Sequence, residues 1–329
     1  MIPDRPYSQI KSTLLGAAIA FAASLPMAAP ALSDYPEKPI TILVGFAPGG
    51  GNDIYARLIA DGLREDLGQP VVVVNKPGAA GSIAAKDAAE ADGDGYTLLV
   101  TNAGTMISKE IIDGDKSKID SEKDFIVLGS IGRLETAVMV PTDSQFETVG
   151  ELIDYAKSNP GSLKWAHAGR GSFQTLGGFT LLETIGVSAK DIPFKGGALA
   201  RGALIAREVD FTVAGLQSAS GYEGEIKPLA VMNNERDPNF EYVQTLSDAG
   251  LPDIDWSGPI MVFAPDDIPA EIVDALTTSI EKVALSESYE EATTAAGLSP
   301  RYMSPVASEN RMHVLRANLV GVIAQIFKK

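Results

Sequence analysis

A glycine loop between two apolar segments is the first feature of the sequence suited to binding a ligand. The segment GFAPGGGNDIYARL, residues 45–58, follows the β-branched run ITILV, and its last residues have the spacing of an amphipathic helix. Asn52 or Asp53 is the expected N-cap of that helix. The unpaired N–H groups of a first helical turn suit a carboxylate or phosphate. The alternative is a tight turn that binds nothing, because glycine turns between strands and helices are common.

Further loops carry the same kind of residues, namely glycine with small hydroxyl, amide or amine side chains. Backbone N–H groups and hydroxyls donate hydrogen bonds, and donors that converge without a base or nucleophile suit holding an anion rather than transforming it. The residues of this kind are Gly49, Gly50, Gly51 and Asn52; Thr101, Asn102 and Thr105; Gly169, Gly171 and Ser172; and Lys195, Gly196 and Gly197.

Enzymatic chemistry has little support in the sequence. None of the motifs G-x-S-x-G, H-E-x-x-H, G-x-G-x-x-G and G-x-x-x-x-G-K-[ST] is present. The absence of cysteine excludes disulfides and thiolate metal sites, and two distant histidines argue against structural zinc. His167 is expected to face a cleft or pack at its rim, and His313 to have a surface or packing role. The segment DGDKSKIDSEKD, 113–124, lacks the glycine and glutamate of a calcium loop and is expected to be solvated.

The N-terminus is predicted to be a cleavable secretory signal peptide, residues 1–33. Arg5 and Lys11 precede the apolar run LLGAAIAFAASL, and Ala31 and Ser33 supply the small residues that a signal peptidase recognises. A membrane anchor is the alternative, but the run is shorter than the ~20 residues needed to cross a bilayer. We therefore expect a secreted protein.

The chain is strongly acidic, with a net charge of −16 over 329 residues. This balance argues against a nucleic-acid-binding protein, which needs a basic face. It also means that local donors must hold any anionic ligand, because the overall field of the protein repels it.

Strands and helices alternate in the first half of the chain. Strands are predicted at 40–46, 70–75 and 96–102, with a helix over 53–67 and another in the segment GAAGSIAAKDAAEA. This βαβαβ order implies a parallel sheet covered by helices. The loops APGGGND and TNAGT follow the carboxyl ends of their strands, where open α/β sheets bind ligands.

The rest of the chain repeats this pattern and predicts a second α/β lobe. We expect residues 34–136 and 259–329 to form lobe 1, and residues 137–258 to form lobe 2. The helical C-terminus is expected to pack back on lobe 1. The chain would then cross between the lobes twice, near 132–137 and 257–262, which makes a hinge with a ligand cleft between the lobes.

These segments resemble the Bug proteins, the periplasmic substrate-binding proteins of the tripartite tricarboxylate transporter. The resemblance rests on the opening YPEKPITILVGFAPGGGNDIYARL with NKPGAAGS and DGYTL, and continues through KDFIVLGSI, SNPGSLKWAHAGRGS, IPFKGGALARGALIAREVDF and GPIMVFAPDDIP. It covers essentially the whole chain after the signal peptide. It implies an α/β fold of the type II-like periplasmic binding protein class, with two lobes that close around a ligand like a Venus flytrap.

The resemblance also implies where the ligand binds. The APGGGND loop would cradle one carboxylate with backbone N–H groups, TNAGT would add contacts from the same lobe, and AGRGS and FKGG would come from the other lobe. The expected ligand-binding residues are Ala47, Pro48, Gly49, Gly50, Gly51, Asn52, Asp53, Thr101, Asn102, Ala103, Gly104, Thr105, Ala168, Gly169, Arg170, Gly171, Ser172, Thr175, Lys195, Gly196, Gly197 and Gly215.

One side of the expected pocket departs from the family pattern G-[ST]-x-x-H-L-A-G-E. Thr175 stands where histidine is usual, Gly177 where alanine is and Phe179 where glutamate is. Arg170 is either a partner for a second carboxylate of the ligand or an exposed or glutamate-paired surface arginine. Lys195 either faces the ligand or supports its own loop, and we favour loop support.

The sequence therefore predicts a solute-binding receptor that captures a small organic carboxylate and delivers it to the membrane subunits of a tripartite transporter. No catalysis, cofactor or metal is expected, and a monomer is expected because a closing cleft needs free lobes. The alternatives are a sensor that presents its ligand to a membrane histidine kinase, or an enzyme on a similar scaffold. The sequence leaves open whether the ligand is a mono-, di- or tricarboxylate or an aromatic acid.

Overall fold

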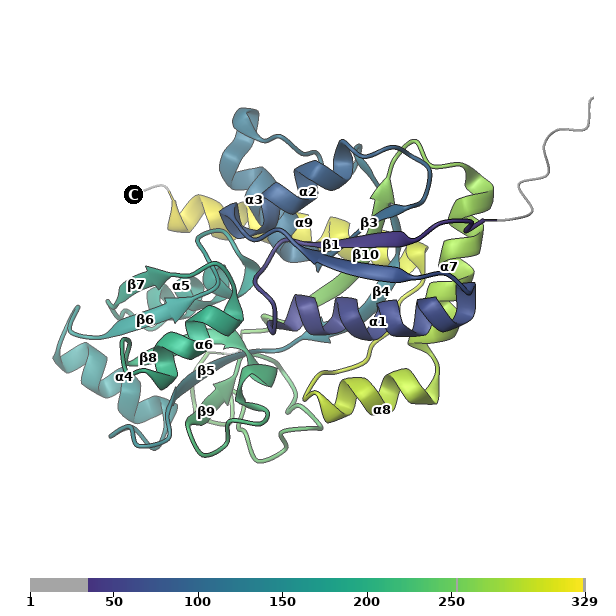
Figure 1. The fold of residues 1–329 in the computed structure, drawn as a ribbon. Coiled ribbons are helices and arrows are strands. Elements are labelled where there is room, and N and C mark those ends of the chain that lie inside the picture. The colour runs from purple at the N-terminus through teal and green to yellow at the C-terminus, as the bar shows by residue number, and fades with distance from the viewer. Residues whose placement is uncertain (1–34, 253, 328–329) are drawn as a thin grey trace, which may run out of the picture. The chain divides into compact units, whose positions relative to one another are not determined.

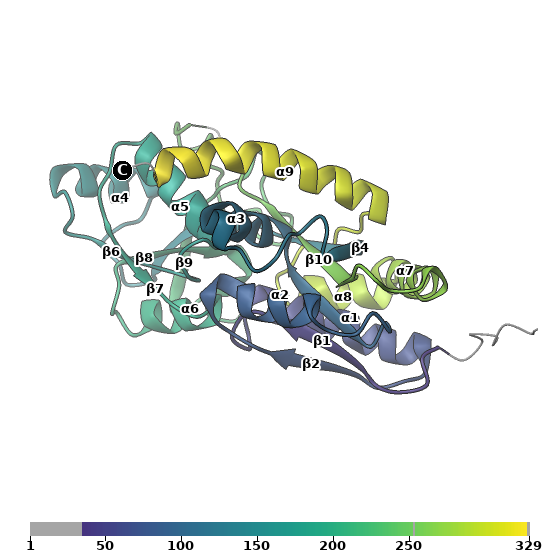
Figure 2. The same cartoon turned by 90° about the horizontal axis from the view of Figure 1, so that it is seen from above.

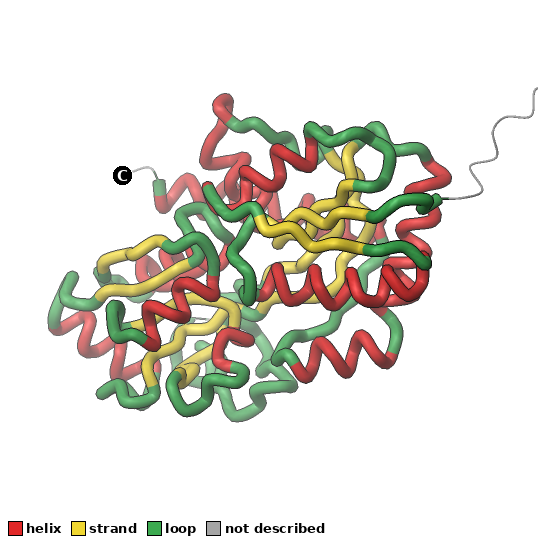
Figure 3. The backbone as a smooth tube through the Cα atoms, in the orientation of Figure 1, coloured by secondary structure: helices red, strands yellow, loops and turns green. Residues whose placement is uncertain are grey.

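The computed structural model describes residues 35–252 and 254–327, and the predicted signal peptide lies outside these residues. Two five-stranded sheets are present, each flanked by helices (Figure 1, Figure 3). Both sheets lie within one unit, Pro36–Lys329. The α/β fold class predicted from the sequence is confirmed.

The first sheet has the strand order β2-β1-β3-β10-β4. Strand β1 runs parallel to both β2 and β3, as the βαβαβ pattern predicts, whereas β10 runs antiparallel to β3 and β4. A strand from near the C-terminus therefore completes the sheet that the N-terminal strands begin. The strands are β1 (Ile40–Val44), β2 (Val71–Asn75), β3 (Thr97–Asn102), β4 (Phe125–Leu134) and β10 (Gly258–Pro265).

The second sheet has the order β7-β6-β8-β5-β9 and is built from a continuous central part of the chain. Strand β6 runs parallel to β7 and β8, whereas β5 runs antiparallel to β8 and β9. The strands are β5 (Thr136–Pro141), β6 (Lys164–His167), β7 (Lys190–Pro193), β8 (Phe211–Gly215) and β9 (Ile226–Val231).

Helices follow most strands, and several begin at a side-chain cap. Asn102, Thr148, Ser172, Ser286 and Ser304 each accept a hydrogen bond from an N–H in the first turn of the helix that follows. The helices are α1 (Gly51–Leu67), α2 (Ser82–Ala89), α3 (Ala103–Asp113), α4 (Val149–Ser158), α5 (Phe173–Thr184), α6 (Gly197–Ile205), α7 (Ala270–Ala284), α8 (Glu287–Ala295) and α9 (Pro305–Ile326), with short 3₁₀ segments η1 (Ala79–Gly81), η2 (Gly114–Lys116) and η3 (Leu216–Ala219).

The start of α1 differs from the prediction that Asn52 or Asp53 caps it. The helix begins at Gly51, its N-cap is Gly50, and no side chain accepts a capping hydrogen bond there. The physical reason is that the Asp53 carboxylate is already held by other groups, so the first N–H groups of α1 are left for another acceptor.

Two connections join the sheets. Glu135 alone separates β4 of the first sheet from β5 of the second, and residues 232–257 lead back from β9 to β10. One hydrophobic cluster runs through both sheets, with Leu99 and Phe263 on the first and Val138 and Trp165 on the second. The same cluster includes residues of α9, which packs against α3 and α5 and runs along one side of the unit (Figure 2).

Candidate ligand-binding site between the sheets

Asp53 holds the glycine loop in place from the first turn of α1. Its carboxylate accepts hydrogen bonds from the Gly49 N–H at 2.8 Å, from the Arg57 guanidinium at 2.9 and 3.0 Å, and from the Asn75 amide at 2.8 Å. Burial alone would raise the pKa of Asp53, but these donors outweigh it and lower the pKa below its usual value of 3.8. Asp53 therefore stays ionised and shapes the loop.

Removing this carboxylate is expected to destabilise the fold. In the variant Asp53→Ala the donors of Arg57, Asn75 and Gly49 lose the buried carboxylate that they share, and we expect a loss of about 2 kcal/mol in the free energy of unfolding. Urea denaturation measures this loss. The matched control is Asp61→Ala on the same helix, whose exposed pair with Arg64 contributes little. Equal stability of the two variants would contradict the structural role of Asp53.

The N-termini of α1 and α6 come from different sheets and face each other. A methyl group built on Gly50 would lie 3.8 Å from the backbone nitrogen of Ala198 and 3.9 Å from that of Gly197. The Ala47 N–H donates a hydrogen bond of 3.1 Å to the Lys195 carbonyl, which ties the two loops together. Each helix N-terminus carries a partial positive charge, so the space between them favours an anion.

A small inner chamber of about 30 Å³ lies between these helix ends. Three of its polar side chains are more than nine-tenths buried: Asn52 at 8 % exposure, Gln174 at 6 % and Gln217 at 8 %. The Asn52 Oδ1 atom has no hydrogen-bond partner among the described residues, and such a buried polar atom is rare unless something completes its bonding. The chamber is lined by Phe46, Gly50, Gly51, Asn52, Leu134, Ala168, Gln174, Gly197, Ala214, Gly215 and Gln217.

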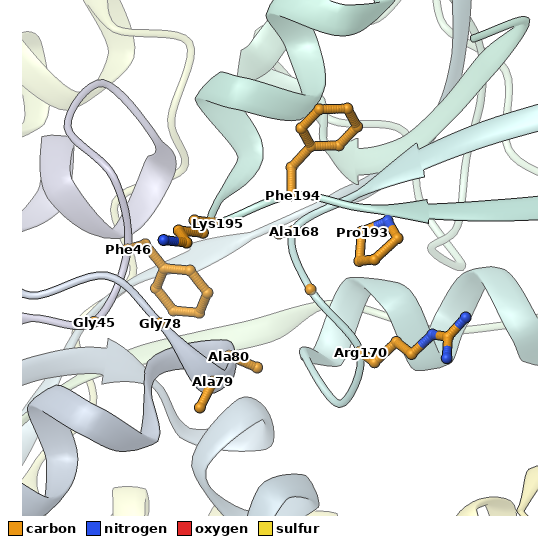
Figure 4. A pocket seen from close by; sticks show the side chains of 11 residues that line it. Gly45, Phe46, Gly78, Ala79, Ala80, Ala168, Arg170, Pro193, Phe194 and Lys195 are labelled. Carbon is orange, nitrogen blue, oxygen red and sulfur yellow. The ribbon is translucent and has the colours of Figure 1, made fainter.

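A second, larger chamber of about 470 Å³ is called here the outer chamber, and Figure 4 shows its lining. Phe46 and Ala168 line both chambers and therefore lie between them. Ala79 and Ala80 contribute from η1, which follows β2, with φ angles of 46° and 52°, a left-handed conformation that non-glycine residues rarely adopt. The outer chamber is lined by Gly45, Phe46, Gly78, Ala79, Ala80, Ala168, Gly169, Arg170, Pro193, Phe194 and Lys195.

The two cations of the outer chamber differ in their partners. Arg170 donates two hydrogen bonds to the Asp191 carboxylate, at 2.8 and 3.1 Å. The hydrogen bond and charge of Asp191 raise the pKa of Arg170. Burial alone would raise the pKa of Asp191, but Arg170 and His167 lower it. The Lys195 ammonium makes no ion pair within residues 35–252 and 254–327, and Figure 4 shows it extending toward Phe46 while Arg170 points away.

His167 supports the second-sheet loop from behind. It is fully buried, its Nδ1 lies 3.1 Å from the Thr175 hydroxyl, and its Nε2 lies 3.3 Å from the Asp191 carboxylate. The Thr175 hydroxyl also donates to the Gly169 carbonyl at 2.8 Å. Burial is the main cause that lowers the pKa of His167. Serine, threonine, histidine and aspartate side chains lie next to one another here. Because the hydroxyls of Ser172 and Thr175 are fully buried, a substrate does not reach them, and the cluster holds the loop in place.

The TNAGT segment lies at the start of α3 and packs against the start of α5. Asn102 caps α3, and the Thr105 hydroxyl accepts a hydrogen bond of 3.0 Å from the Phe173 N–H. Gly104 allows the Phe173 ring to approach, since a methyl group there would lie 2.3 Å from the ring. Residues 101–105 line neither chamber, and their contact with a ligand stays a prediction.

The other predicted residues divide by position. Gly50, Gly51, Asn52, Ala168, Gly197 and Gly215 line the inner chamber, and Ala168, Gly169, Arg170 and Lys195 line the outer one. The remainder shape the surrounding loops and line neither chamber: Ala47, Pro48, Gly49, Asp53, Gly171, Ser172, Thr175 and Gly196. Sequence reasoning missed Gln174 and Gln217. Each lies two residues after a predicted site residue, Ser172 and Gly215 respectively, in the first turn of α5 or η3, and this spacing is the signal that could have found them.

Within the described part of the chain, no group of three or more acidic or histidine side chains is placed to hold a metal ion. None of the helices there combines the length and the apolar character that a membrane span requires.

Comparison with known proteins identifies the class. Residues 55–318 match the tripartite tricarboxylate transporter family receptor. The chain is 29 % identical over 290 residues to Protein BugT of Bordetella pertussis, covering 87 % of this chain and 88 % of that one. An R. palustris protein solved with adipate superposes with a TM-score of 0.85 at 29 % identity, covering 89 % of this chain and 98 % of the other.

A second solved structure of a related protein has a similar fold. MatC from Rhodopseudomonas palustris, with bound malate, superposes with a TM-score of 0.81 at 27 % identity, covering 88 % of this chain and all of that chain. The chain therefore belongs to the tripartite tricarboxylate transporter receptor family, and the predicted resemblance to the Bug proteins is confirmed. This is a family of solute-binding receptors.

Proposed function

We propose that this protein is a periplasmic receptor that captures a small organic carboxylate between its two sheets and delivers it to the membrane subunits of a tripartite transporter. In this proposal the protein binds its ligand without transforming it, and residues 1–33 export it. The two sheets act as two lobes: lobe 1 comprises residues 34–136 and 259–329, and lobe 2 comprises residues 137–258. The lobes move relative to each other about Glu135 and the 232–257 connection.

The observation that carries this proposal is the pair of helix N-termini facing each other across the inner chamber. Backbone N–H groups at the start of α1 and α6 are donors for one carboxylate, and the partial charges of both helices favour an anion. The Asn52, Gln174 and Gln217 side chains add neutral polar contacts. Among the residues that the structure describes, no acidic side chain lines the chamber to oppose a bound carboxylate. The adipate and malate of the two related structures belong to the same chemical class.

A thermal-shift screen of the purified protein against a panel of mono-, di- and tricarboxylic and aromatic acids tests ligand capture. A ligand at 100 times its Kd stabilises the native state by about 2.7 kcal/mol, which raises the Tm by several degrees at this chain length. We expect one chemical class of acids to give that shift and the corresponding amides to give none. A flat response to every acid, confirmed by calorimetry, would refute ligand capture.

Delivery needs a separate measurement. We expect cells that lack this protein to lose uptake of the radiolabelled acid selected by the screen, and to recover it on expression of the full chain. Normal uptake without the protein would contradict delivery while leaving capture intact.

A further inference from the structure

Phe173 directly precedes Gln174 of the inner chamber, and its backbone is bonded to two other segments of the chain. Its N–H donates a hydrogen bond of 3.0 Å to the Thr105 hydroxyl of α3. Its carbonyl accepts a hydrogen bond from the indole N–H of Trp256, which lies on the 232–257 connection between the sheets. The first turn of α5 is therefore fixed by groups outside its own helix and sheet.

The Phe173 and Trp256 side chains also stack on each other and are called here the aromatic pair. Their ring centroids are 5.0 Å apart, with an interplanar angle of 25°. Both side chains are buried. Aromatic rings prefer defined mutual geometries and stabilise one another beyond the apolar area that they bury. The ring of Phe173 is thus held by the same tryptophan that binds its carbonyl.

Three glycines from three elements leave room for the aromatic pair. A methyl group on Gly104 of α3 would lie 2.3 Å from the Phe173 ring, and one on Gly258 of β10 would lie 2.9 Å from it. A methyl group on Gly177 of α5 would lie 2.5 Å from Trp256. Glycine weakens helices and strands relative to alanine, so close packing is the physical reason for it at these positions. The aromatic pair therefore has little freedom to shift.

Gln174 connects this packing to the ligand site. Its side chain is buried and lines the inner chamber, whereas Trp256 lies outside the lining of both chambers. Because the chamber holds only about 30 Å³, a small shift of the first turn of α5 displaces the Gln174 amide from its contacts there. Binding groups keep their geometry only when the residues around them lock it by packing and hydrogen bonds.

We propose that Trp256 is a positioning residue of this receptor. Through its hydrogen bond to Phe173 and its stack on that ring, it fixes the first turn of α5 and holds the Gln174 amide where the amide contacts the ligand carboxylate. The affinity of the inner chamber then depends on the 232–257 connection, one of the two segments that join the sheets. This inference rests on the proposed function and adds to it a residue outside the chamber on which binding depends.

Hydrogen exchange of the protein without any acid tests whether Trp256 fixes the first turn of α5. Trp256→Phe keeps an aromatic ring and removes the N–H donor. We expect the amides of residues 173–176 to exchange at least tenfold faster in this variant, and those of α4 to keep their wild-type rates.

The matched control is Trp165→Phe. It shortens another buried tryptophan, whose indole N–H has no hydrogen-bond partner within the described residues. Exchange of residues 173–176 should stay within twofold of wild type in this control. Equal acceleration in the two variants would show a general loosening of the core and overturn the assignment.

Titration calorimetry tests whether Trp256 acts through Gln174. The probe is the one of malate, adipate, citrate and benzoate that gives the largest thermal shift. We expect Trp256→Phe and Gln174→Ala each to weaken its binding at least tenfold, and Trp165→Phe to leave it within twofold of wild type. The double variant of Trp256 and Gln174 should bind no more than twofold more weakly than Gln174→Ala, because the amide that Trp256 positions is already absent. Effects that multiply, or wild-type affinity in either single variant, would refute the inference.

A second variant leaves Trp256 in the chain and disturbs only its packing. Gly177→Ala places a methyl group against the indole ring and should also weaken binding at least tenfold. Gly150→Ala in α4 is its control, because a methyl group there makes only an ordinary contact of 3.8 Å with the Thr148 hydroxyl. Equal affinity of these two variants would contradict the role of Trp256. If none of the acids bound, the proposed function would fail, while the hydrogen-exchange result would still decide whether Trp256 fixes α5.

Discussion

Gly51→Ala is expected to weaken binding of the receptor's carboxylate about 100-fold while the fold stays intact. A methyl group at this position would lie 2.4 Å from Leu134 Cδ2 and 2.7 Å from Gln217 Nε2. Both atoms are ends of flexible side chains that can move aside, but the methyl group and the displaced Gln217 then fill a chamber of only about 30 Å³. A loss of this size corresponds to about 2.7 kcal/mol of binding free energy. Titration calorimetry with the acid selected by the screen measures it.

Gly202→Ala is the matched control for this variant. Gly202 is also a helical glycine, in α6, and a methyl group there meets nothing within 4 Å. Its replacement should leave the affinity unchanged and stabilise the helix slightly. If Gly51→Ala bound the acid as tightly as Gly202→Ala, the inner chamber would not be where the carboxylate lies.

Glu135 is expected to make stability depend on pH between about 4.5 and 7. Burial raises the pKa of this carboxyl from 4.5 to about 7; Arg133 opposes the rise, and Asp237 and Asp255 add to it. The native state therefore holds a proton that the unfolded chain has already released in this range. The stabilisation is complete below pH 4.5 and is lost as the pH rises through 7, by about 3 kcal/mol in total.

Urea unfolding of wild type and Glu135→Gln from pH 4.5 to 8 measures this effect. The neutral amide does not titrate, so the variant should gain about 3 kcal/mol relative to wild type over that range. The quantity compared is the difference in unfolding free energy between variant and wild type. His167, whose pKa is lowered by burial, makes stability rise with pH equally in both proteins, so its contribution cancels in that difference. Glu241→Gln, at an exposed position, should follow wild type. Parallel curves for wild type and Glu135→Gln would contradict the assignment.

Local pattern was enough to predict the elements that carry the site. The β-branched run before the glycine loop and the helical spacing after it fix β1 and α1 to within a few residues, since both signals come from neighbouring positions. The error at the N-cap has a tertiary cause. Asp53 accepts from Arg57 on its own helix but also from Asn75 on β2, and the second contact depends on how the strands pair.

The partners of the chamber cations could not be predicted for the same reason. Asp191 meets Arg170 because β6 and β7 pair in parallel with Trp165 opposite Asp191. The register between two strands depends on the pairing of the whole sheet, so it cannot be predicted from the sequence of a single loop. Gln217 reaches the inner chamber because η3 turns back toward Gly51 after β8. The glycine loops therefore indicated where an anion could bind, whereas the size of the inner chamber and the arrangement of its side chains depended on long-range contacts.

The hydrophobic cluster that runs through both sheets has a consequence for how the protein folds. Leu99 and Phe263 share one core with Val138 and Trp165, so part of the apolar interior is common to both sheets, although the second sheet also has a cluster of its own that includes Met139. The halves are therefore thermodynamically dependent, and cutting the chain between them would expose the shared core on both pieces.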